Sequence, residues 1–330
     1  MAYVVVGNPK GLPAVVGDID LVVEADVFHR LLRDRDLWFG ERWMLVQAMR
    51  HEASAVTFVL TPRHASDPAS PPELLLIDVC SDYVRDARFL MSASSLLAAR
   101  RRYTPPAGGV DIWVPPPESA FTYYLVKKVA KGQVDEDAFS YLMDTLAEAP
   151  EPPITAFFGA PASSAALEAV GRADIEALRL LLPQLRRELY SRTPRRPRDV
   201  VRHVRHVVGR LRWPAGLLVE VFGGDPDAAR VVADGLADDL RRAFRRTSVA
   251  SHSASSGFSP MQLWGLLLRT GLVIHIGRQY GSGHRLRALL PPHLRTSIWL
   301  RDADVIDVAI RRASRLVIDH LAARASDRLG

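Results

Sequence analysis

The chain has very little cysteine and no long apolar run. Its single cysteine, Cys80, has no partner for an intramolecular disulfide, which fits a reducing compartment. No apolar stretch approaches the roughly 20 residues that are needed to span a bilayer. Met1 leads almost directly into an apolar segment, so we expect no signal peptide. Together these absences predict a cytoplasmic protein without a membrane span.

Histidine and aromatic residues lack the arrangements that mark other kinds of site. The ten histidines show no metal-ligand spacing, and His203 and His206, three residues apart in a basic segment, have no evident further ligand. The arginine-rich residues 186–212 contain few aromatic side chains that could stack on bases. Nucleic-acid binding by this segment stays open, but a solvated helix between domains is the interpretation we prefer.

The overall composition is that of a soluble globular protein, with 48% hydrophobic and 24% charged residues. A length of 330 residues allows two domains of ordinary size. The formal net charge of +6 favours nucleic acid, an anionic membrane face or nucleotide phosphates as partners. An arginine-rich genome would produce the same charge without any such partner. The composition leaves the oligomeric state open.

Two aspartates, Asp18 and Asp20, interrupt the otherwise apolar residues 15–23. Residues two apart in a strand face the same side, so both carboxylates project from one face. Two anions there repel each other, and burial penalises each of them. A divalent cation between them relieves both costs, and Mg2+ prefers carboxylate oxygens together with substrate phosphate. The pattern therefore predicts a metal site on this strand.

A third aspartate, Asp78, is the single interruption of the apolar residues 74–80, in which Cys80 is expected as a core residue. An Asp-x-Asp strand followed by a strand-borne Asp resembles the acidic triad of the nucleotidyltransferase (DNA polymerase beta-like) superfamily. Residues 3–132 are similar, more narrowly, to bacterial nucleotidyltransferase-like proteins of surface-polysaccharide gene clusters. One departure is that Gly7-Asn8-Pro9 stands where the superfamily usually carries Gly-Gly or Gly-Ser.

The resemblance implies a chemistry for the three aspartates. Asp18 and Asp20 would bind two Mg2+ (or Mn2+) ions together with a nucleoside triphosphate, the NTP. Asp78 would bind the ion nearest the attacking hydroxyl and help to deprotonate that hydroxyl. The reaction would transfer a nucleoside monophosphate from the NTP to a small-molecule or sugar-phosphate acceptor, in surface-polysaccharide or secondary metabolism.

Further residues are candidates for contact with the nucleotide phosphates. Gly7, Asn8 and Lys10 belong to the loop that should face the acidic strand. Lys127 and Lys131 lie four residues apart near a helix C-terminus, so they share a face that could meet the triphosphate. Favourable interaction of these two lysines with the helix dipole is the alternative, and it is the interpretation we prefer.

Apolar periodicity predicts an α/β (α+β) chain with three parts. They are a small mixed-sheet domain with C-terminal helices at 1–150, a basic helical linker at 151–213, and an α/β domain at 214–330. Family resemblance, not periodicity, implies that the first is nucleotidyltransferase-like and that the last is a degenerate P-loop-kinase-like domain. The expected strands are two within 1–23, then 55–60, 74–80, 110–114 and 217–222, while 38–49 is open between helix and strand. The expected helices are 26–36, 92–102, 118–132, 135–149, 164–190 with a kink at Pro183, 231–244, 261–271 and 300–324, and the expected loops are 61–72 and 247–259.

The segment that follows strand 217–222 has the order of a phosphate-binding loop. This strand, the sequence Gly223-Gly224-Asp225-Pro226 and a helix resemble a thymidylate-kinase-like domain. A working loop needs glycines around the phosphates, then Lys, then Ser or Thr for Mg2+. Here Ala229 and Arg230 occupy the last two positions, and Pro226 removes an N–H donor. We therefore expect this pseudokinase-like half neither to bind ATP tightly nor to transfer phosphate.

Two functions of different class follow from these patterns. The first is a Mg2+-dependent nucleotidyltransferase, motivated by the acidic triad. The second is a catalytically inactive nucleotidyltransferase-like binding or scaffold protein, motivated by the absent Gly-Ser and the altered phosphate loop. Convergence of Asp18, Asp20 and Asp78 on one point would favour the enzyme, whereas carboxylates that are splayed or capped by basic side chains would favour the scaffold.

Overall fold

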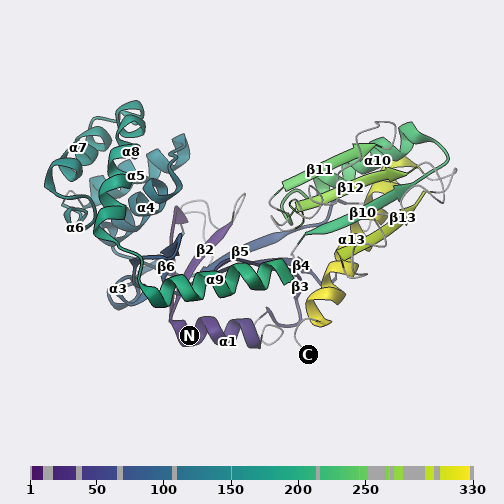
Figure 1. The fold of residues 1–330 in the computed structure, drawn as a ribbon, viewed down its shortest axis with the longest axis horizontal. Coiled ribbons are helices and arrows are strands. Elements are labelled where there is room, and N and C mark those ends of the chain that lie inside the picture. Colours follow the sequence, from purple (N-terminus) through teal and green to yellow (C-terminus); the bar gives the residue numbers. More distant parts are fainter. Residues whose placement is uncertain are drawn as a thin grey trace. The chain divides into compact units, whose positions relative to one another are not determined.

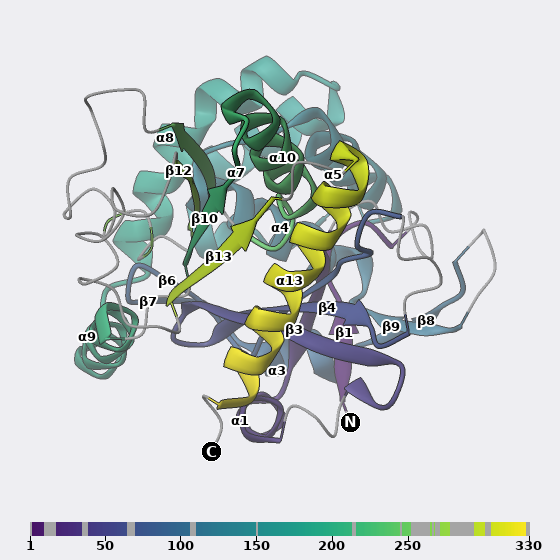
Figure 2. The same cartoon turned by 90° about the vertical axis from the view of Figure 1, so that its right-hand side faces the viewer.

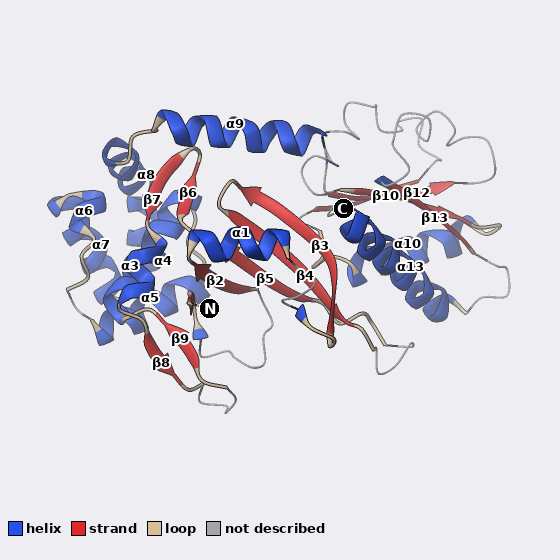
Figure 3. Cartoon of the chain, turned by 90° about the horizontal axis from the view of Figure 1, so that it is seen from below, coloured by secondary structure: helices blue, strands red, loops and turns tan. Residues whose placement is uncertain are grey.

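The computed structural model is a mixed α/β protein whose helices and strands are shown in Figure 3. The residues that it describes are 2–9, 18–34, 39–64, 70–105, 110–149, 151–212, 216–244, 246–251, 265, 267, 271–277, 294–300 and 305–327. The chain divides into two compact units. The first comprises Met1–Leu32, Arg50–Val56 and Ile77–His206, and the second comprises Arg33–Met49, Thr57–Leu76 and Val207–Gly330. Among the described helices, none has the length and apolar character needed to cross a membrane.

The acidic strands lie in a five-stranded sheet with the order β1-β2-β5-β4-β3. Strand β1 pairs antiparallel with β2, and β2 pairs parallel with β5. The bounds of these strands are β1 (Tyr3–Val5), β2 (Ile19–Val23), β3 (Trp43–Glu52), β4 (Ala55–Pro62) and β5 (Leu75–Cys80). The strands expected within 1–23, at 55–60 and at 74–80 are therefore confirmed, and the ambiguous segment 38–49 contains most of β3.

Helices make up most of the rest of the first unit, together with two small hairpin sheets, β6-β7 and β8-β9. The helices are α1 (Ala25–Arg33), α3 (Ala93–Ala98), α4 (Pro117–Lys131), α5 (Glu136–Glu148), α6 (Thr155–Phe158), α7 (Ala160–Gly171), α8 (Ile175–Arg192) and the start of α9 (Pro197–Arg212). The strands are β6 (Tyr83–Arg85), β7 (Arg88–Met91), β8 (Arg101–Tyr103) and β9 (Ile112–Val114).

The helices α4 to α8 share one hydrophobic core. Phe121 and Val126 of α4 pack in the same buried cluster as Phe158 of α6, Ala166 of α7 and Leu178 of α8. Helix α4 ends at Gly132, whose φ of 75° is the left-handed conformation that glycine adopts at little cost. Residues 151–206 thus belong to the first unit, so the boundary expected after 150 does not coincide with the division of the chain.

The second unit contains a parallel sheet with the order β11-β12-β10-β13, labelled in Figure 1. Its elements are β10 (Leu217–Phe222), α10 (Pro226–Asp239), β11 (Arg246–Ser251), β12 (Gly271–Gly277), β13 (Arg295–Trp299) and α13 (Ile306–Asp327). Every residue of β10 is buried, as expected for the central strand of a parallel sheet. Val219 and Ile274 pack in one cluster with Val232 of α10 and Ile310 of α13. Figure 2 shows α10 and α13 together with β10, β12 and β13.

Four of the expected elements differ from the structure in extent or type. The single helix expected at 164–190 is two helices, α7 and α8, because Ala173 takes a positive φ of 57° and Asp174 caps a new helix. Residues 247–251 of the expected loop are strand, since β11 pairs with β12. The helix expected at 92–102 ends at Ala98, and 101–103 form β8. The helix expected at 231–244 begins earlier, at Pro226, a residue suited to the first turn.

Substitution of one core leucine tests the packing of α8 against α4. Leu178 is completely buried, whereas Leu180, two residues along the same helix, is 81% exposed. We expect Leu178→Ala to lower the free energy of unfolding by about 2–5 kcal/mol, because it removes buried methyl groups and leaves a cavity. Leu180→Ala is the matched control and should change it by less than about 0.5 kcal/mol. Urea titration followed by circular dichroism measures both, and equal effects would contradict this packing.

Candidate functional site

Two of the three predicted aspartates are neighbours in the first unit. Asp20 of β2 and Asp78 of β5 are directly paired in the parallel register of the two strands. Paired positions project their side chains on the same face of a sheet, so the two carboxylates share one side. Asp18 lies two residues before Asp20, just outside β2, and is exposed. Strand pairing therefore brings Asp20 and Asp78 together.

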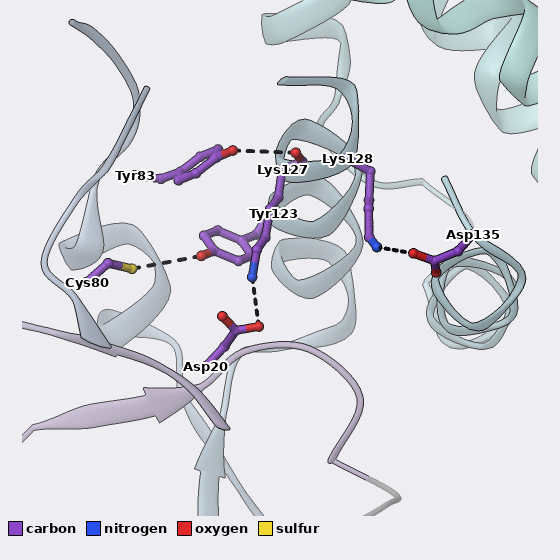
Figure 4. Close-up of polar contacts among 7 residues, drawn as sticks. All are labelled: Asp20, Cys80, Tyr83, Tyr123, Lys127, Lys128 and Asp135. Atoms are coloured by element: carbon purple, nitrogen blue, oxygen red, sulfur yellow. Dashed lines mark hydrogen bonds and ion pairs between the residues drawn. The ribbon is translucent and has the colours of Figure 1, made fainter. Parts of the chain in front are cut away.

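A lysine from helix α4 binds one of these carboxylates. The Nζ atom of Lys127 lies 2.7 Å from Oδ2 of Asp20, and their side chains are 12% and 26% exposed (Figure 4). Burial lowers the pKa of Lys127, but the charge of Asp20 and its hydrogen bond outweigh this effect, so the pKa is raised overall. Asp78 contributes to the same increase. The ammonium group of Lys127 therefore acts as the cation of the aspartate pair.

A layer of weakly acidic hydroxyl and thiol groups lies next to this ion pair. The Tyr123 hydroxyl is 3.9 Å from Sγ of Cys80, and the Tyr83 hydroxyl donates to the carbonyl of Lys127 at 3.4 Å (Figure 4). Burial raises the pKa of the Cys80 thiol to about 12 and that of Tyr83 to about 12. Burial also raises the pKa of Tyr123. These groups stay neutral, so they leave Lys127 as the charge that faces Asp20.

The turn after β1 approaches the same carboxylate. The Val6 amide donates to the carbonyl of Asp20 at 2.9 Å. Gly7 has a φ of 104°, and a Cβ atom there would lie 3.7 Å from Oδ2 of Asp20. This backbone conformation favours glycine. Asn8 follows and is exposed, whereas Lys10 lies outside the described residues. Gly7 thus lies beside Asp20, as expected for the loop that faces the acidic strand.

The end of α4 adds further positive charge. Lys128 is held in an ion pair with Asp135, 3.0 Å away. Lys131, one turn beyond Lys127, is exposed. Partial burial and the charge of Lys127 lower the pKa of Lys131, and Lys128 and Arg85 act in the same direction. Like charges are thus concentrated here, and an anionic ligand would relieve their repulsion.

The three aspartates do not form a compact metal site in this structure. Within the described residues, no group of three or more His, Cys, Asp or Glu side chains is arranged so that it could hold a metal ion. Asp20 and Asp78 remain a pair of oxygen donors on one face, which is the number of carboxylates that Mg2+ often takes when phosphates supply other ligands. The arrangement thus combines two carboxylates of adjacent strands with the ammonium groups of Lys127 and Lys131.

In the second unit, strand β10, a loop and helix α10 follow one another in the order expected from the sequence, and the N-terminus of α10 is capped by Asp225. The Asp225 side chain accepts from the Asp227 amide at 2.9 Å, and Pro226 has no N–H. Ala229, at the position of the phosphate-binding lysine, is 1% exposed and packs in the core. Arg230 forms an ion pair with Asp234 instead. A carboxylate at the helix N-terminus repels phosphate, so the loop is ill suited to ATP.

Sequence reasoning missed the direct contact between Lys127 and Asp20. The signal was the spacing of lysines on α4, which we interpreted through the helix dipole or the triphosphate. It also missed the roles of Tyr83 and Tyr123, because aromatic residues on a buried helix face or strand are usually core residues.

Neither a known protein family, nor a curated protein, nor a solved structure matches this chain.

The raised pKa of Cys80 predicts a thiol that reacts slowly. Thiolate is the reactive form, and a pKa of about 12 leaves little thiolate at pH 8. We expect iodoacetamide to modify Cys80 at least about tenfold more slowly in the folded protein than in urea at the same pH. Mass spectrometry of the intact chain measures both rates. Equal rates would show that burial does not protect the thiol.

Removal of Lys127 should destabilise the fold in a pH-dependent way. Lys127→Met leaves Asp20 without its cation, so we expect a loss of about 1–3 kcal/mol in the free energy of unfolding at pH 7. The folded pKa of Lys127 is raised above its usual 10.5. Its contribution is therefore complete below about pH 10.5 and is lost as the pH rises through the folded value.

Urea unfolding at neutral and alkaline pH tests this expectation. The difference between wild type and Lys127→Met should be largest at neutral pH and shrink above about pH 10.5. Lys128→Met is the matched control, because its partner Asp135 is 61% exposed and stays solvated. A Lys127→Met effect that is no larger than the control, or that grows with pH, would contradict the proposed ion pair.

Proposed function

We propose that the first unit is a nucleotidyltransferase that transfers a nucleoside monophosphate from an NTP to a small-molecule or sugar-phosphate acceptor. The observation that carries this proposal is the register pairing of Asp20 with Asp78, next to the Gly7 turn and the lysines of α4. Carboxylates and ammonium groups at one place match an NTP bound with a divalent cation. The surface-polysaccharide or secondary-metabolism setting rests on the sequence resemblance alone.

The donor set suits one Mg2+ or Mn2+ ion. The ammonium group of Lys127 lies 2.7 Å from Asp20, so the carboxylate of Asp20 already stabilises a positive charge at this position. Asp20 and Asp78 would hold the ion, and Asp18 would join them only by moving from its exposed position. When bound, the ion neutralises phosphate charge and makes the acceptor hydroxyl more acidic.

The side chains of this chain then have distinct roles. Lys127, which pairs with Asp20 in this structure, would bind a phosphate oxygen of the NTP, and Asp20 would be one of the two carboxylates that hold the divalent ion. Lys131, exposed on the same face of α4, would contact the same phosphates. Asp78 would accept the proton of the acceptor hydroxyl that attacks the α-phosphorus, and pyrophosphate would leave.

A second candidate function has its own support. The pairing of Asp20 with Lys127 is a carboxylate capped by a basic side chain. Such a cap is the geometry that favours a catalytically inactive protein that binds a nucleotide or a partner enzyme. The capped α10 helix of the second unit fits the same interpretation. The two functions differ in one respect, because only the enzyme requires a cation at Asp20 when nucleotide binds.

Calorimetric titration separates the two functions. Each NTP is titrated into the full chain with Mg2+, with Mn2+ and with EDTA. For the enzyme we expect binding that depends on the metal and is weakened at least about tenfold in Asp18→Asn/Asp20→Asn. Asp26→Asn is the control, because Asp26 is an exposed aspartate of α1 in the same unit. It should bind like wild type.

The other outcomes each identify a different conclusion. Nucleotide binding that is the same in EDTA favours the inactive binding protein. Micromolar ATP binding that survives Asp18→Asn/Asp20→Asn would place a nucleotide site elsewhere and would overturn our prediction that the altered phosphate loop is silent. No binding of any NTP by any variant would refute both nucleotide-based functions.

A further inference from the structure

An arginine of the first unit lies close to the lysines of α4. Arg85 is the last residue of β6, which pairs with β7 in a hairpin. Asp86 and Ala87 form the turn with positive φ angles of 51° and 60°, as a tight two-residue hairpin loop requires. On the same strand, the Tyr83 hydroxyl donates to the carbonyl of Lys127 at 3.4 Å (Figure 4). The hairpin therefore brings Arg85 to this part of α4.

Arg85 is electrostatically linked to α4 on two sides. Burial raises the pKa of Tyr83, and the charge of Arg85 and its hydrogen bond to the hydroxyl oppose that increase. A phenol hydroxyl can accept one hydrogen bond while it donates another, so Tyr83 connects Arg85 to the carbonyl of Lys127. Burial and the charge of Lys127 lower the pKa of Lys131, and Arg85 adds to that decrease. Arg85 and Lys131 are therefore close enough to repel each other.

Another arginine reaches the end of α4 from α8. Arg186 follows Leu185, which is completely buried in the core that α8 shares with α4. The Nη1 atom of Arg186 lies 3.4 Å from the point at which a Cβ atom of Gly132 would stand. Gly132 follows Lys131 and is the C-cap of α4. The guanidinium of Arg186 therefore lies against the end of the helix that carries Lys131.

Tyr190 of α8 links the hairpin turn to Arg186. Its hydroxyl donates to Oδ2 of Asp86, the residue after Arg85, at 3.0 Å. The Cζ atom of Arg186 lies over the Tyr190 ring, 5.3 Å from its centroid, and Nη2 is 3.4 Å from the hydroxyl. Stacking covers the face of a guanidinium, whereas its N–H donors point outward in the plane of the group. The turn after Arg85 and the side chain of Arg186 are thus fixed by the same tyrosine.

The cations around the end of α4 differ in whether a carboxylate pairs with them. Lys127 and Lys128 each lie within 3.0 Å of an aspartate oxygen. Within the part of the chain that the structure describes, no carboxylate forms an ion pair with Lys131, Arg85 or Arg186. Among the same residues, the buried Nε atom of Arg85 has no hydrogen-bond partner. Unpaired cations placed together repel, and a bound anion removes that cost.

The dipole of α4 does not balance this charge. A helix C-terminus is equivalent to roughly half a negative elementary charge, whereas Lys131, Arg85 and Arg186 each carry a full positive charge. The dipole therefore accounts for an exposed lysine at the helix end and leaves net positive charge. Guanidinium groups match the geometry of phosphate oxygens through paired N–H bonds. An anion with several phosphate oxygens is thus the ligand that suits the three cations.

We propose that Lys131, Arg85 and Arg186 form an oligophosphate subsite, which takes the terminal phosphates of the NTP. The inference rests on the proposed function, in which Asp20 and Lys127 hold the metal-bound part of the NTP. Lys131 lies on the same face of α4, about 6 Å further along the helix axis. Phosphates that extend from Lys127 along the helix therefore meet these cations, and the subsite makes the protein prefer triphosphates to monophosphates.

Inorganic tripolyphosphate tests the subsite without the metal site. Calorimetry measures the affinity of the full chain for tripolyphosphate in EDTA, and for ATP and AMP with Mg2+. In Arg85→Gln/Arg186→Gln we expect tripolyphosphate and ATP to bind at least about tenfold more weakly than in wild type. AMP lacks the terminal phosphates, so its affinity should change by less than about twofold. The preference for ATP over AMP should therefore fall with the two arginines.

Two further variants make the test specific. Arg172→Gln/Arg187→Gln removes the same charge from exposed arginines after α7 and on α8. This control should bind all three ligands within about twofold of wild type. Lys131→Gln changes an exposed side chain, so it tests the subsite even where the double arginine variant is unfolded, and it should weaken tripolyphosphate binding at least about threefold. Circular dichroism verifies that each variant keeps its helices.

The outcomes separate the subsite from the proposed function. Tripolyphosphate and ATP affinities that are equal in wild type and Arg85→Gln/Arg186→Gln, or equally reduced in the control, overturn the subsite. Metal-dependent ATP binding would then still support the nucleotidyltransferase. Tripolyphosphate binding that the arginine variant loses, without NTP binding by wild type, supports the subsite and refutes the proposed function. Displacement of tripolyphosphate by glucose 1-phosphate but not by ATP would assign the cations to the acceptor and overturn the proposal.

Discussion

The ion pair between Asp20 and Lys127 is the interaction on which the candidate site depends. It joins β2 to α4, two elements of the first unit, through atoms 2.7 Å apart. Neither charge is well solvated, and a partly buried charge without a partner is costly. A shift of α4 along β2 would therefore leave both Lys127 and Asp20 without an ion-pair partner. The Tyr83 and Tyr123 hydroxyls, which lie beside this pair, are positioned by the same docking of α4.

The local sequence pattern was sufficient to predict the strands that carry Asp20 and Asp78. It was insufficient to predict that Lys127 pairs with Asp20. The alternation of Asp18 and Asp20 with apolar residues predicted β2, and the apolar run around Asp78 predicted β5. Their parallel pairing then aligns Asp20 with Asp78. Lys127 is 107 positions from Asp20 in the chain. Its contact depends on how α4 packs against the sheet, which spacing along α4 does not encode.

The errors in the helical region have a common physical origin. Residues 150–163 are rich in Pro, Ala and Gly, a composition that suggests a linker. Small side chains also let helices approach closely, and Ala162 and Ala166 are buried between helices in the shared core. Periodicity correctly predicted a helix in the basic segment 186–212, but not which side of α9 faces the protein. Asp199 of α9 is buried, whereas Val200, Val201 and Val204 on the same helix are exposed.

The two units differ in the charged groups that they offer to a phosphate. In the second unit the amides at the start of α10 are capped by Asp225, and Ala229 is buried in the core. A phosphate there would have to displace a carboxylate and would find no lysine. In the first unit Lys127 and Lys131 share a helix face, and Lys127 is paired with Asp20, the carboxylate that would bind the metal ion in the proposed function. Exchange of one cation for another at Asp20 costs less than creating a charged site in a core. Among the described residues, the proposed nucleotide site therefore requires less rearrangement in the first unit than in the second.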